Sequence, residues 1–165
     1  MKDLQLVGII IQLAALVGYL GYCLAKFGLT DTISATWYEH KTIVGKIFFT
    51  AFLVLITIPI MFFIPEASKW GWVIFLGVLG VVLVSVAPDY KKHEFISTLH
   101  VWGAIAGAVL VLTGIWLVFG ALWPVLVTAG ISVGAWLLKL KGATYYAELA
   151  TMLMAIGFEI QTYLS

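Results

Sequence analysis

Long apolar runs separated by short polar stretches make up almost all of this 165-residue chain. A helix needs about 20 apolar residues to cross the hydrocarbon core of a bilayer, and the runs are close to that length. Backbone groups in lipid must be paired within the protein, and the runs are too long for barrel strands. We therefore expect one all-α domain, a polytopic integral membrane bundle of six transmembrane helices. The expected spans are residues 4–25, 44–64, 70–87, 96–119, 122–138 and 143–163.

Prolines agree with this division of the chain. Pro65 and Pro88 follow the second and third runs, where a ring that cannot continue a helix is tolerated. Pro59 lies inside the second run and removes one intrahelical hydrogen bond, so we expect a kink there.

Small residues recur on one face of several runs. The hydrophobic effect does not drive apolar helices together in lipid, so close backbone approach through small residues must help to hold a bundle together. We expect these small faces to form seams inside the molecule, with homodimerisation as the alternative. The glycines concerned are Gly18, Gly21, Gly77, Gly80, Gly103, Gly107, Gly130 and Gly134.

Composition supports the membrane assignment. Hydrophobic residues make up 63% of the chain and charged residues 10%, whereas charged residues are about a quarter of a soluble protein. The net charge of +1 comes from nine lysines and eight acids, without a basic stripe. Nucleic acid is therefore not an expected partner.

The lysines predict an orientation. With six spans, one side of the membrane receives Lys26, Lys41, Lys46, Lys91, Lys92, Lys139 and Lys141, and the other only Lys2 and Lys69. Cytoplasmic loops carry the excess of lysine, so we expect loops 26–43, 88–95 and 139–142 to be cytoplasmic and both termini to be extracytoplasmic. This orientation requires an even number of spans.

Polar residues gather on that same side. An ionisable side chain inside a span costs about 2.5 to 3.5 kcal/mol on insertion scales, which makes His100 and Glu148 informative. We expect these two side chains to form a buried pair, close to the loop after the first span and the loop after the third. The alternative is that the loop charges are simply solvated. The candidate site residues are Ser34, Tyr38, His40, Asp89, His93, His100 and Glu148.

Three kinds of function fit these residues. The leading hypothesis is a site at the cytoplasmic headgroup level that binds or helps to process a membrane lipid. The partner at this site could instead be another membrane protein or a second copy of the chain. A small proton-coupled transporter is the alternative, because Gln12, Glu148 and Glu159 lie inside spans. The sequence carries no standard enzyme signature, so whether the protein is catalytic stays open.

A zinc-dependent lipid hydrolase is the third hypothesis. His40, His93 and His100 are the potential zinc ligands. His93 and His100 would lie ~10 Å apart on one helix, which is too far for a shared ion. We therefore expect no cofactor.

Three short patterns carry a resemblance to known families. They are residues 33–36 (Ile-Ser-Ala-Thr), 84–90 (Val-Ser-Val-Ala-Pro-Asp-Tyr) and 100–104 (His-Val-Trp-Gly-Ala). In this order the chain resembles the six-span family of the DRAM autophagy modulators and the membrane proteins of GPI-anchor lipid remodelling, which implies a lipid-facing or structural role. A fainter likeness is to the ceramidase and progestin-receptor membrane hydrolases, which implies lipid amide hydrolysis at zinc. Those hydrolases have seven spans and closely spaced histidines, which this sequence lacks.

Overall fold

The computed structural model of the chain describes residues 2–64, 68–86 and 94–165. All regular secondary structure in these residues is helical, and a helical segment lies on each apolar run of the sequence. The all-α fold expected from the sequence is confirmed. The elements are α1 (Lys2–Ala15), η1 (Leu16–Leu20), α2 (Gly21–Phe27), α3 (Thr36–Glu39), α4 (Ile43–Thr57), η2 (Ile58–Phe63), α5 (Gly71–Val86), α6 (Glu94–Phe119), α7 (Trp123–Leu137) and α8 (Ala143–Leu164).

Within the described residues, three helical segments are long and apolar enough to cross a membrane: Lys2–Phe27, Ile43–Phe63 and Glu94–Phe119. The helices Gly71–Ser85 and Trp123–Leu137 are apolar but shorter. Large apolar side chains stay exposed along the outer surface of these helices, far more than a soluble protein tolerates. The described surface is therefore suited to lipid.

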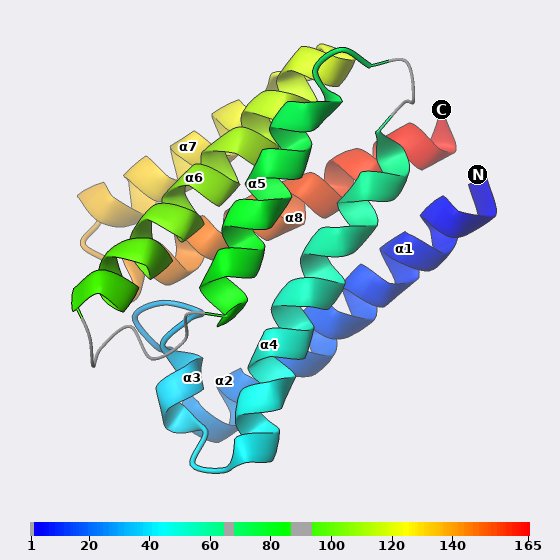
Figure 1. Cartoon of the computed structure of the whole chain (residues 1–165). Coiled ribbons are helices and arrows are strands. Elements are labelled where there is room, and N and C mark those ends of the chain that lie inside the picture. The colour runs from blue at the N-terminus through cyan, green and yellow to red at the C-terminus, as the bar shows by residue number, and fades with distance from the viewer. Residues whose placement is uncertain (1, 65–67, 87–93) are drawn as a thin grey trace.

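The helices form a single bundle with two distinct ends (Figure 1). The N- and C-termini lie at one end, and α3 lies at the other. Within the bundle, α5 packs on α6 and α7 on α8, while α1 contacts α4, η2 and α8. The connection that contains α3 thus lies at the end opposite the termini.

A glycine seam joins α5 to α6. A Cβ atom added to Gly77 would lie 2.6 Å from the backbone nitrogen of Val111, and one added to Gly80 would lie 3.0 Å from the carbonyl oxygen of Gly103 and 3.0 Å from Gly107. The two backbones approach so closely that no side chain fits between them. The expected internal seam is confirmed at these glycines.

The seam expected on the fifth apolar run is wrong. Cβ atoms added to Gly130 and Gly134 would meet nothing within 4 Å. Helix α7 instead buries Pro124, Thr128 and Ala135. Because successive residues of an α-helix are rotated by about 100°, Gly130 lies about 200° round the helix from Thr128 and faces outward.

Pro59 changes the type of helix. Helix α4 ends at Thr57 and continues as the 3₁₀ helix η2, which has Pro59 in its first turn. In a 3₁₀ turn the carbonyl of Ile56 would accept from residue 59, but proline has no N–H to donate. The Gln12 side chain fills this gap, donating from Nε2 to the Ile56 oxygen at 2.9 Å.

The same amide group also reaches a carboxylate. Gln12 Nε2 donates to Glu159 Oε1 at 3.1 Å, so one side chain of α1 holds both α4 and α8. Gln12 is 0% exposed and Glu159 2% exposed. Glu159 therefore lies inside the bundle, beside the Gln12 side chain that joins α1 to α4.

Candidate functional site

The connection between α2 and α4 folds back onto the bundle. Ile33, Thr36 and His40 are 1%, 1% and 5% exposed, unlike residues of a solvated loop. Its backbone is held to the start of α8, since Tyr145 N donates to the carbonyl oxygen of Asp31 at 3.1 Å. This loop can therefore hold side chains in fixed positions.

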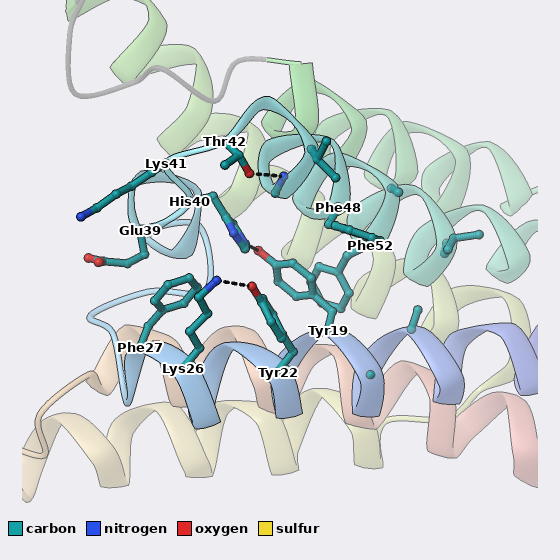
Figure 2. A pocket seen from close by; sticks show the side chains of 16 residues that line it. Tyr19, Tyr22, Lys26, Phe27, Glu39, His40, Lys41, Thr42, Phe48 and Phe52 are labelled. Carbon is teal, nitrogen blue, oxygen red and sulfur yellow. Dashed lines mark hydrogen bonds between the residues drawn. The ribbon is translucent and has the colours of Figure 1, made fainter.

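A groove of about 860 Å³ opens where this loop meets two helices (Figure 2). One wall is a stripe of the segment 15–27, and the other is one face of α4. We call it the α1–α4 groove. It is lined by Ala15, Gly18, Tyr19, Tyr22, Lys26, Phe27, Glu39, His40, Lys41, Thr42, Val44, Gly45, Phe48, Ala51, Phe52 and Leu55.

Small residues keep the groove open. A Cβ atom added to Gly18 or to Gly21 would meet nothing within 4 Å, so the helix–helix seam expected at these glycines is wrong. Gly18 lies on the groove wall opposite α4, where Ala51 is also small. Gly18 belongs to the π-helical turn η1, a type of turn that is frequent at functional sites.

A directed chain of hydrogen bonds holds His40 at one end of the groove. The Thr36 hydroxyl donates to the carbonyl oxygen of Ile33 at 2.6 Å, so Thr36 Oγ1 is the acceptor of the 2.7 Å bond from the Tyr19 hydroxyl. The Tyr19 oxygen is then left to accept from His40 Nε2, 3.4 Å away. This order assigns the proton of the neutral imidazole to Nε2.

Aromatic rings and a lysine surround the same imidazole. The His40 ring stacks on Tyr22 at 6.0 Å with 4° between the planes, and it meets the edge of Phe27 at 5.2 Å. Burial lowers the pKa of His40, and the charge of Lys26 lowers it further. His40 is therefore a neutral hydrogen-bonding group.

Lys26 is exposed, and its ammonium lies over two aromatic rings at the loop end of the groove. Its ammonium donates to the Tyr22 hydroxyl at 2.6 Å and lies 5.1 Å and 5.4 Å from the ring centroids of Tyr22 and Phe27. Among the described residues, no carboxylate lies within 4.0 Å of this ammonium. In Figure 2 it lies close to His40, whereas the Glu39 and Lys41 side chains point away from the helices.

A second, smaller cavity of about 100 Å³ lies inside the bundle between α4, α5, α6 and α8. Ser34 and Glu148 line it together with Thr57 and Thr151, although most of its wall is apolar. The Glu148 carboxylate accepts a hydrogen bond from the backbone nitrogen of Ile33. Glu148 thus fixes the folded loop to α8.

The structure separates the residues expected to form one site. His40 lines the α1–α4 groove, whereas Ser34 and Glu148 line the smaller cavity. Tyr38 is half-buried in α3 and His100 is buried in α6; neither lines either cavity. The pairing of His100 with Glu148 stays a prediction.

Two further candidates, Asp89 and His93, lie outside the described residues. Within the described ranges, no group of three or more His, Cys, Asp or Glu side chains is placed to hold a metal ion. A zinc site built from His40 and His100 alone would lack ligands, because structural and catalytic zinc sites use at least three protein ligands.

Sequence reasoning missed groove residues on both walls, among them three polar residues of the first helical segment. Tyr19, Tyr22 and Lys26 follow one another at steps of three and four, which places them on one helix face. That spacing was the available signal, but Lys26 and Lys41 were interpreted only as markers of orientation.

Comparisons of the chain with protein-family models, with curated proteins and with solved structures find no match.

Proposed function

We propose that this chain is a six-span membrane protein that binds a membrane lipid in the α1–α4 groove, with the lipid headgroup at the cytoplasmic face. The observation that carries the proposal is the shape and lining of the groove. The volume of about 860 Å³ is in the range of small-molecule sites, roughly 300 to 1,000 Å³.

The lining of the groove changes along its length in the way an amphiphile requires. Ala15, Gly18, Ala51 and Leu55 form an apolar part along the helices, suited to an acyl chain. The polar part is at the loop, where His40 and its hydrogen-bonded neighbours can meet a headgroup. A single lipid molecule satisfies both parts at once.

The arrangement of the chain supports the proposed topology. Both termini lie at one end of the bundle, which is what an even number of spans produces (Figure 1). The connection that carries Lys41 lies at the opposite end, and the turn after α7 carries Lys139 and Lys141. By the lysine bias we assign the groove's polar end to the cytoplasmic side.

Lipid binding is favoured over the transporter and the hydrolase by where the acids lie. Glu159 lines neither the α1–α4 groove nor the smaller cavity. Glu148 lines the smaller cavity and is bonded to the backbone of Ile33. The resemblance to the lipid-remodelling family also implies a lipid-facing role.

Filling the groove tests the proposal. In Gly18→Phe the new ring enters the apolar part of the groove without a clash at Cβ, and bound lipid should be lost. Gly21→Phe is the matched control, because Gly21 is equally open but does not line the groove. Native mass spectrometry of the protein in neutral detergent with added phospholipid measures the bound lipid, and circular dichroism checks the fold. Equal lipid on both variants would show that the groove is not the site.

A further inference from the structure

We infer that the lipid in the α1–α4 groove carries an anionic headgroup and that Lys26 recognises it. This inference rests on the proposed function and adds the chemical class of the ligand. It comes from the position of the Lys26 ammonium, the neutrality of its neighbours and the outward direction of the remaining charges.

The Lys26 ammonium is positioned before any ligand arrives. A lysine ammonium has three N–H donors, and the Tyr22 hydroxyl takes one of them at 2.6 Å. The rings of Tyr22 and Phe27 hold the charge through contacts of 5.1 Å and 5.4 Å. Two donors stay available for the oxygens of a phosphate, and little side-chain entropy is lost on binding.

No other charge at the polar end cancels this one. His40 is neutral at pH 7, since burial and Lys26 both lower its pKa. Glu39 and Lys41 carry opposite charges and point outward from the loop (Figure 2). Because Glu39 and Lys41 also line the groove and their charges offset each other, the net charge of its polar end is that of the Lys26 cation.

This arrangement discriminates between headgroups. A phosphodiester with a neutral alcohol, as in phosphatidylglycerol, presents an unpaired negative charge to Lys26. A choline headgroup brings a second cation close to the same ammonium, and like charges at short range repel. One lysine near a membrane surface changes the affinity for an anionic lipid by roughly five- to tenfold.

The experiment is a competition between phosphatidylglycerol and phosphatidylcholine with identical acyl chains, measured by native mass spectrometry of the full chain in neutral detergent. The wild type should favour phosphatidylglycerol by roughly five- to tenfold, and Lys26→Gln should remove this preference while still binding both lipids. Lys141→Gln is the matched control, because Lys141 is an exposed lysine that does not line the groove. Its preference should equal that of the wild type.

The outcomes separate the two proposals. Equal binding of both lipids by the wild type, blocked by Gly18→Phe, would overturn the anionic preference and leave lipid binding intact. Equal loss of preference in Lys26→Gln and Lys141→Gln would overturn the role of Lys26, since general surface charge would then explain it. Inorganic phosphate is the third arm: its failure to displace phosphatidylglycerol supports a lipid ligand, and displacement would identify a site for the free anion instead.

Discussion

Replacing Gln12 by methionine tests the buried polar contact at the centre of the bundle. Methionine keeps the length and flexibility of the side chain but removes the amide. Two acceptors lose their donor, the Ile56 carbonyl at 2.9 Å and the Glu159 carboxylate at 3.1 Å. Both lie where water does not reach, because Gln12 is 0% exposed. We expect the folded protein to be destabilised.

The loss in the free energy of unfolding depends on whether each acceptor finds another hydrogen-bond donor when the helices separate. Side-chain hydrogen bonds in membrane proteins contribute about 0.6 kcal/mol on average and up to about 1.7, because separated helices find other partners. Glu159 can find such partners, so its bond should contribute near the average. The Ile56 carbonyl has no such alternative in its own 3₁₀ turn, because the residue placed to donate to it is Pro59, which has no N–H. We therefore expect Gln12→Met to lower the free energy of unfolding by about 2 kcal/mol.

Equilibrium unfolding in mixed micelles, followed by circular dichroism, measures this change. Gln5→Met is the control: Gln5 lies on the same helix, and its Nε2 donates to the carbonyl oxygen of Phe62 at 3.2 Å, but this bond is exposed. Gln5→Met should lower the free energy of unfolding by less than about 0.5 kcal/mol. Equal losses in the two variants would refute the argument that burial and Pro59 make the Gln12 contact important.

Three further predictions concern other contacts. Gly45→Ala should destabilise by about 1 to 3 kcal/mol in thermal unfolding, because its Cβ would lie 2.5 Å from His40 Nδ1; an unchanged midpoint would show that the ring moves freely. Gly77→Ala should cost a similar amount by separating α5 from α6, whereas Gly130→Ala, with open space around it, should be neutral or stabilising. Because the pKa of His40 is lowered, the folded protein binds fewer protons than the unfolded one, so stability should fall as the pH drops below about 6.5. Thermal unfolding from about pH 5 to pH 8 should show a smaller slope in His40→Gln, and identical slopes would contradict this assignment.

The helices themselves could be predicted from the sequence because their signals are local. Apolar length locates each long helical segment, although not the four-residue helix α3 in the expected loop 26–43, and Pro59 changes the helix type within a turn of its position. The glycine seam between α5 and α6 was also predictable, since Gly103 and Gly107 share a helix face. The same spacing of two glycines gave a wrong prediction at Gly130, because spacing alone does not show which face of a helix meets a neighbour.

The α1–α4 groove could not be predicted, because it depends on contacts between residues that are far apart in the sequence. Lys26 and His40 are brought together only by the loop that folds back under α2, and that loop is held by bonds to Glu148 and Tyr145 on the last helix. The candidate residues Ser34 and His40 are close in sequence, yet they line different cavities.

Helical segments, their approximate limits and the membrane-compatible surface were thus determined by the sequence alone. Apart from the glycine seam between α5 and α6, the tertiary structure alone decided which helix faces pack together, and hence where the α1–α4 groove opens. The physical reason is that lipid is as apolar as the interior of the bundle. A helix such as α6 has no amphipathic stripe, so only its glycines, and not its pattern of apolar residues, mark the buried face.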